Sequence, residues 1–79
     1  MRRSSSGSDG PLTRREREIA ALVAEGLSNA EIAQRLTISP GTAANHIAHI
    51  MRALGARNRV HIAMWTVEQG LRDRAADAR

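Results

Sequence analysis

Four polar residues recur every three or four positions within one stretch of this chain: Thr42, Asn45, His49 and Arg52. At about 100° per residue, a helix places these four side chains together on one side. An Asn amide can bind adenine through two hydrogen bonds, and an Arg guanidinium can bind guanine or a phosphate. Thr42 can contact a phosphate or the methyl group of thymine. These residue types at this spacing predict a helix that reads base edges in a major groove.

The opposite side of the same predicted helix is apolar, and its residues fall within an arc of roughly 100°. They are Ala43, Ile47, Ile50, Met51 and Leu54. A solvated polar face is all that most amphipathic helices need, so this pattern alone does not require DNA. His46 lies between the two faces, where we expect packing or hydrogen bonding. Although His46 and His49 have a spacing that can bind metal, no neighbouring Cys, Asp or Glu completes a site, and we expect no metal or cofactor.

Two capping signals and a short turn place another helix before this one. The segment 28–36 begins with a Ser-x-x-Glu capping box and continues as an apolar stripe. Thr37-Ile38 form the turn, and the helix 40–54 begins after the N-cap residue Ser39 and ends before Gly55. This is a predicted helix-turn-helix, whose second helix enters the groove by its N-terminal end. Backbone N–H groups at both helix starts suit phosphate, around Ser28, Asn29, Ser39 and Thr42.

Two further helices flank this motif. A Thr-x-x-Glu capping box at Thr13 begins a helix that a following glycine ends. Asn58 can cap a last helix over 59–69, which we expect Gly70 to end. Residues 72–79 alternate charge with Ala, and they either extend this helix or fray. Because strand-forming residues are scarce, the sequence predicts an all-α fold of four helices.

The last predicted helix carries more apolar residues than one small monomer can bury. One face holds Val60, Ala63 and Val67, and the other apolar residues point elsewhere: Ile62, Met64 and Trp65. An exposed Trp beside Ile or Met is typical of an interface. We therefore predict a symmetric homodimer through Ile62, Met64 and Trp65. The alternative is that Trp65 packs on the first helix.

Length and composition bound the class of protein. The chain has 79 residues, enough for one domain with a small core, and 42% of them are hydrophobic. The formal charge is +4, with 12 basic residues that are all Arg, which is compatible with a polyanionic partner. There is no Cys, no apolar run of about 18 residues and no signal-peptide core, so we expect a soluble cytoplasmic protein without a membrane partner. No nucleophile–base pair or phosphate-binding glycine loop is visible, so we expect no enzyme.

The chain divides into three segments. Residues 1–11 are rich in Ser and Gly and predict a short flexible arm, which is followed by a domain over 12–71 and a tail over 72–79. The arm is either a linker or a basic arm that places Arg2 and Arg3 on phosphates or in a minor groove.

The pattern resembles a known family of DNA-binding domains. From Leu12 to Leu71 the chain is similar to the LuxR/GerE-type domain, found at the C-terminus of NarL-like response regulators and quorum-sensing regulators. The matching residues are Leu12-Thr13, Arg15 to Glu18, Gly26 to Asn29, Glu31 to Ala33, Leu36, Ile38-Ser39, Thr42, His46, Ile50, Leu54-Gly55, Arg57 to Arg59 and Gly70-Leu71. This resemblance implies a four-helix domain, transcriptional regulation and dimerisation through the fourth helix.

The chain departs from this family on the predicted groove face. Members typically carry Lys at the position of Ala44, some carry a second Lys at Ala48, and a common Lys near the helix end is Ala53 here. Fewer phosphate contacts weaken DNA binding and flatten its dependence on salt. We expect arginines at the edges of the face to compensate: Arg14, Arg15, Arg52, Arg57 and Arg59.

These observations predict a bacterial transcriptional regulator that binds double-stranded DNA in the cytoplasm, in association with the nucleoid. The expected DNA contacts are Ser28, Asn29, Ser39, Thr42, Ala44, Asn45, Ala48, His49, Arg52, Arg57 and Arg59. The alternative is a protein-interaction module with the same fold, which docks on another regulator or on RNA polymerase and binds DNA weakly or not at all.

Overall fold

The computed structural model describes residues 11–77 of the chain, and the side chains of residues 11–70. It contains α2 (Arg14–Ala24), α3 (Asn29–Leu36), α4 (Pro40–Leu54) and α5 (Arg59–Asp77). No strand occurs within 11–77, which confirms the all-α prediction for this part of the chain. The predicted basic arm with Arg2 and Arg3 lies outside the described residues.

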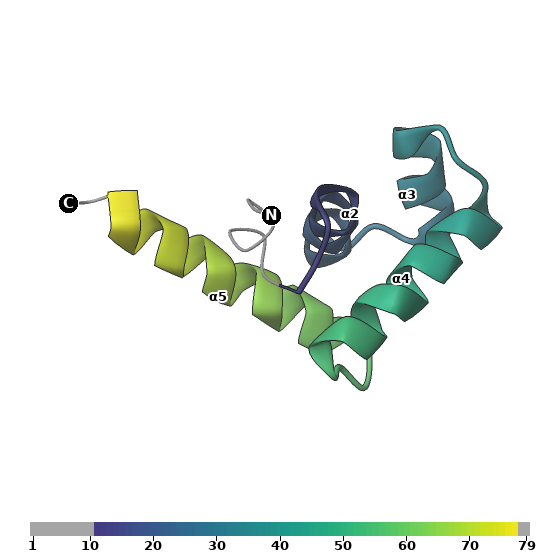
Figure 1. Cartoon of the computed structure of the whole chain (residues 1–79). Coiled ribbons are helices and arrows are strands. Elements are labelled where there is room, and N and C mark those ends of the chain that lie inside the picture. The colour runs from purple at the N-terminus through teal and green to yellow at the C-terminus, as the bar shows by residue number, and fades with distance from the viewer. Residues whose placement is uncertain (1–10, 78–79) are drawn as a thin grey trace, which may run out of the picture.

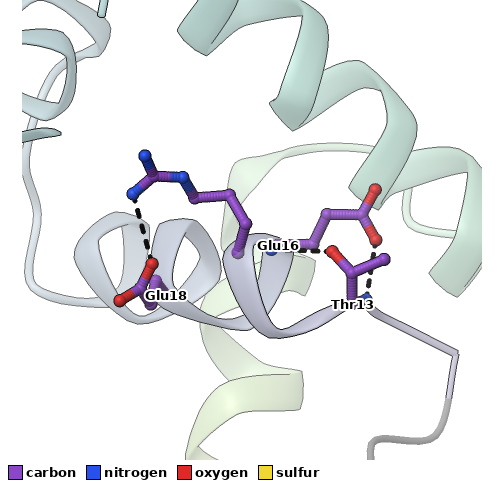
Figure 2. Close-up of polar contacts among 4 residues, drawn as sticks. Thr13, Glu16 and Glu18 are labelled. Atoms are coloured by element: carbon purple, nitrogen blue, oxygen red, sulfur yellow. Dashed lines mark hydrogen bonds and ion pairs between the residues drawn. The ribbon is translucent and has the colours of Figure 1, made fainter. Parts of the chain in front are cut away.

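The helix starts confirm the capping signals of the sequence. At α2 the backbone N–H of Glu16 donates to Thr13 Oγ1 at 3.1 Å, and that of Thr13 donates to Glu16 Oε1 at 3.0 Å (Figure 2). An exposed ion pair joins Arg15 to Glu18 at 3.2 Å on the same helix. The Thr13–Glu16 capping box satisfies two backbone donors that a helix start leaves unpaired, so Thr13 and Glu16 define where α2 begins.

Three helix ends use the same turn, in which a residue one or two positions past the helix adopts a left-handed conformation. Gly26 (φ 92°) and Gly55 (φ 65°) fill this position after α2 and α4. After α3 the position belongs to Thr37 (φ 60°), although left-handed geometry costs a side-chain-bearing residue about 1–2 kcal/mol. The turn is held by a hydrogen bond from the Ile38 N–H to the Ala33 carbonyl at 2.9 Å. The tight turn between α3 and α4 therefore forms without a glycine.

The core lies where α2 packs into the angle between α4 and α5, and α3 packs on α4 (Figure 1). Ile50 and Ile62 bring α4 and α5 into this core, and both side chains are fully buried. The buried set is Leu12, Ile19, Ala20, Leu22, Val23, Ile32, Ala33, Ala43, Ile47, Ile50 and Ile62. In Figure 1 the second half of α5 extends beyond the other helices. Within 11–77, no helix is both long enough and apolar enough to cross a membrane.

Helix α5 bears on three predictions. Ile62 is 0% exposed, so its assignment to a dimer interface was wrong: it faces α2 and α4 inside the monomer. Trp65 is half-buried against the core, with the Arg17 guanidinium of α2 6.0 Å from its ring centroid, which supports the alternative of packing on α2. The helix also does not end at Gly70, because this glycine keeps a helical conformation and the chain continues helically to Asp77.

Candidate nucleic-acid interface

Helix α4 presents the polar face that the sequence predicts. Its buried side holds Ala43, Ile47 and Ile50, with Met51 and Leu54 half-buried beside them. The opposite side is exposed and consists of Thr42, Ala44, Asn45, Ala48, His49 and Arg52. We call these six residues the α4 face. Among the described residues, no side chain or backbone group hydrogen-bonds to the side chains of Asn45, His49 or Arg52, so their polar atoms are left for an outside partner.

The start of α4 is organised by one serine. Ser39 Oγ accepts the backbone N–H of Thr42 at 3.0 Å and donates its hydrogen to Thr42 Oγ1 at 2.9 Å. Thr42 keeps its own hydroxyl hydrogen for an external acceptor. Pro40 has no N–H, so the outward backbone donor in the first turn of α4 is that of Gly41. An N–H and a hydroxyl at a helix start form a site suited to one phosphate oxygen.

The start of α3 is organised by a reciprocal cap. The backbone N–H of Ser28 donates to Glu31 Oε1, which leaves the N–H groups of Asn29 and Ala30 as the outward donors. The pKa of Glu31 is lowered from its ordinary 4.5, first by the hydrogen bond from the Ser28 backbone, then by the Ser28 hydroxyl and by Arg35. The carboxylate therefore stays ionised and keeps the cap closed at neutral pH.

Two of the predicted phosphate contacts bind each other. Arg59, at the start of α5, donates from Nη1 to Asn29 Oδ1 at 2.5 Å and from Nη2 to the Leu27 carbonyl at 2.7 Å. Both Arg59 and Asn29 are half-buried. We call this pair of hydrogen bonds the Arg59 clamp. Sequence reasoning missed it because its partners are 30 and 32 residues apart and no local spacing connects them.

The start of α5 confirms Asn58 as the predicted cap and adds a contact from His61 that sequence reasoning missed. Asn58 Oδ1 accepts the backbone N–H of His61 at 3.1 Å, and His61 Nδ1 accepts that of Arg57 at 3.1 Å. The signal was available, because Asn58-x-x-His61 repeats the spacing of the Thr13–Glu16 box with an imidazole in place of a carboxylate. The contact fixes the backbone of Arg57 and leaves its guanidinium exposed.

The geometry joins the start of α5 to the start of α3 and presents an exposed, unengaged face of α4, in the order of a helix-turn-helix. The profile of the family described as "Bacterial regulatory proteins, luxR family" matches residues 10–66. This chain belongs to the luxR family. The match covers α2, α3 and α4 and ends within α5, so the second half of α5 lies beyond it.

Curated relatives agree with this luxR-family membership. A Mycobacterium bovis protein named as an HTH-type transcriptional regulator is 47% identical over 53 residues, which are 67% of this chain and 6% of that protein. The transcriptional regulatory protein DesR of Bacillus subtilis is 43% identical over 60 residues, 76% of this chain and 30% of that protein. The nitrate/nitrite response regulator NarL of Escherichia coli is 40% identical over 58 residues, 73% of this chain and 27% of that protein. The chain thus spans less than a third of each of these relatives.

Proposed function

We propose that this luxR-family domain binds double-stranded DNA as a bacterial transcriptional regulator, with α4 in the major groove. The α4 face carries the proposal, because it combines exposure with polar groups that the protein itself leaves unengaged. The named functions of the relatives support it, since each is called a transcriptional or response regulator. This role is positional rather than enzymatic, and it assigns the protein to the cytoplasm beside the nucleoid.

The polar residues of the α4 face are suited to contact bases and phosphates, and its alanines let the helix come close to them. Asn45 is suited to adenine, while Thr42, His49 and Arg52 are suited to bases or phosphates around it. Ala44 and Ala48 add no charge, but their small side chains let the helix approach the base edges closely. Ser28, Asn29 and Ser39 offer helix starts to the phosphates on either side, and Arg57 adds an exposed cation.

A homodimer through α5 fits this mode of binding. The exposed face of α5 holds Val60, Met64 and Val67, which are 62%, 62% and 59% exposed. We call these three residues the α5 outer face, and it borders an apolar hollow of about 330 Å³. Two copies joined there would bury this apolar surface and present two α4 helices to half-sites about one DNA turn apart. Met64 stays in the proposed interface, whereas Val60 and Val67 replace Ile62 and Trp65, which pack within the monomer.

A fluorescence anisotropy titration on mixed genomic duplex at two salt concentrations tests the proposal. We expect binding near the micromolar range that weakens steeply as salt rises, because phosphate contacts release counterions. Asn45→Asp adds a negative charge to the α4 face without changing its shape and should weaken binding strongly. Gln34→Glu makes the same chemical change on the exposed side of α3 and is the matched control. Absence of binding at low salt would refute the proposal.

A second candidate function follows from the charge of the α4 face. It contains one arginine, Arg52, and no lysine, since Ala44 stands where family members typically carry Lys and Ala48 where some carry a second. A face of this kind suits a protein partner, such as another regulator or RNA polymerase, better than it suits bare phosphate. The titration separates the two candidates: a protein-docking module binds mixed DNA weakly or not at all, and Asn45→Asp then leaves that weak affinity unchanged.

A further inference from the structure

The Arg59 clamp joins the start of α5 to the start of α3. Arg59 is the first residue of α5, and Asn29 is the first residue of α3. The core packing of α3 is with α4 and α2, so the clamp is a polar link across segments that are 30 residues apart. It uses both terminal nitrogens of the guanidinium, one on a side-chain amide and one on a backbone carbonyl.

We propose that Arg59 is a positioning residue of the DNA site, which sets the start of α3 against the phosphates without binding a phosphate itself. The proposal rests on the proposed DNA-binding function and corrects the expectation that Arg59 contacts DNA directly. Its ground is the Arg59 clamp: the guanidinium is half-buried, and Nη1 and Nη2 each donate a hydrogen bond to the protein, so the terminal fork that binds a phosphate bidentately is already engaged.

The consequence for DNA binding runs through α3. The first helix of a helix-turn-helix crosses the phosphate backbone, so the outward N–H groups of Asn29 and Ala30 are in the position to meet a phosphate. The clamp holds the Leu27 carbonyl and the Asn29 side chain on either side of that start. Without the clamp, these N–H donors are still present, but their orientation is no longer fixed. Ordering them on DNA binding then costs conformational entropy, which weakens affinity.

Arg57 provides a matched comparison two residues away. Its guanidinium is exposed, and the structure engages only its backbone, through the N–H donated to His61. Arg57 therefore has the geometry of a direct phosphate contact, and Arg59 has the geometry of a support. The two arginines carry the same charge and lie two residues apart. They differ in that the protein hydrogen-bonds the side chain of Arg59 but not that of Arg57.

The salt dependence of DNA binding distinguishes these roles. Removing a phosphate contact lowers the slope of log affinity against log salt by about 0.9, whereas losing a positioning residue lowers affinity and leaves the slope unchanged. In anisotropy titrations over a series of salt concentrations, we expect Arg57→Ala to flatten the slope. We expect Arg59→Met to reduce affinity about tenfold, the effect of one charge-assisted hydrogen bond, with the wild-type slope. Amide NMR should show the Asn29 and Ala30 signals shifting on duplex addition in the wild type and much less in Arg59→Met.

A second variant covers the case in which Arg59→Met does not fold. Asn29→Ala removes one half of the clamp and keeps the arginine charge, and we expect a smaller loss of affinity with an unchanged slope. In the double variant the two losses should not multiply, because both changes break one unit. A flattened slope for Arg59→Met, an unchanged affinity for it, or multiplying losses would each overturn the proposal. A wild-type protein that binds no DNA would instead refute the proposed function on which it rests.

Discussion

Ser28 and Glu31 each satisfy a backbone donor of the other, with the Ser28 N–H 2.8 Å from Glu31 Oε1 and the Glu31 N–H 3.1 Å from Ser28 Oγ. Two donors at the start of α3 are thereby paired by residues three positions apart. The same contact keeps the Glu31 carboxylate ionised, because hydrogen bonds to a carboxylate favour its charged form. The hydrogen bonds of the cap therefore depend on the protonation state of the Glu31 carboxylate, and so on pH.

The pH dependence of this cap has a definite sign. The pKa of Glu31 is lower in the folded protein than its ordinary 4.5, so its contribution to stability is present above pH 4.5 and is lost as pH falls through the folded pKa. In Glu31→Gln this contribution no longer titrates. The difference in unfolding free energy between wild type and Glu31→Gln should therefore shrink in acid. Glu25→Gln is the control, because it makes the same change at a glutamate that takes no part in this cap. An NMR titration midpoint of the Glu31 carboxyl at or above 4.5 would contradict this account.

Truncating Ile62 and truncating Met64, two positions apart on α5, should change stability by very different amounts. Ile62→Ala removes a fully buried side chain from between α2 and α4, and we expect a loss of about 2–5 kcal/mol in unfolding free energy. Met64→Ala, on a side chain that is 62% exposed in the single chain, should change the unfolding free energy of the monomer by less than about 0.5 kcal/mol. Urea denaturation followed by circular dichroism measures both. Equal effects would mean that the buried and exposed sides of α5 are assigned incorrectly.

The α5 outer face should control assembly. Met64→Glu places a charge in the centre of this apolar surface, and we expect it to shift the protein to monomer because burying an unpaired charge is costly. Equilibrium sedimentation, alone and on a duplex with two half-sites, measures the effect. Gln34→Glu adds the same charge on α3 and should leave assembly unchanged. A wild-type protein that is monomeric in both conditions would count decisively against the dimer.

Restoring lysines to the α4 face should strengthen its grip on phosphate. Ala44→Lys and Ala48→Lys each add a cation at an exposed position of α4. For each lysine that reaches a phosphate, affinity rises and the salt slope steepens by about 0.9. Titrations at several salt concentrations measure this, with Gln34→Lys as the control for added charge elsewhere. If the lysines on α4 act no differently from that control, the α4 face does not lie against DNA.

Asn45 should govern sequence preference more than affinity. A bidentate Asn–adenine contact discriminates against the wrong base by about 1–3 kcal/mol. Asn45→Ala should therefore remove the preference at one base pair of a selected site while binding to mixed DNA changes less. Competition titrations with duplexes that vary one base pair at a time show the effect. Unaltered selectivity in Asn45→Ala would exclude Asn45 as the base-reading residue.

Much of the fold was predictable because its signals are local. The boxes at Thr13–Glu16 and Ser28–Glu31, and the glycines after α2 and α4, act within one helical turn, so spacing alone locates these helix ends. The separation of α4 into apolar and polar sides follows from its helical period. One local signal was misleading: Gly70 ends no helix, since a glycine terminates a helix only where the chain turns, and here it continues.

The sequence by itself determined where α2, α3 and α4 begin and end, which side of α4 is buried, and which polar side chains α4 exposes. Only the tertiary structure decided which side of α5 enters the core, because Val60, Ile62, Met64 and Trp65 are similarly apolar and only packing against α2 and α4 distinguishes them. It also decided the contacts of Arg59. A charge-based reading assigns this arginine to DNA, but the fold brings Asn29 and the Leu27 carbonyl within reach of its guanidinium, and the protein engages it first.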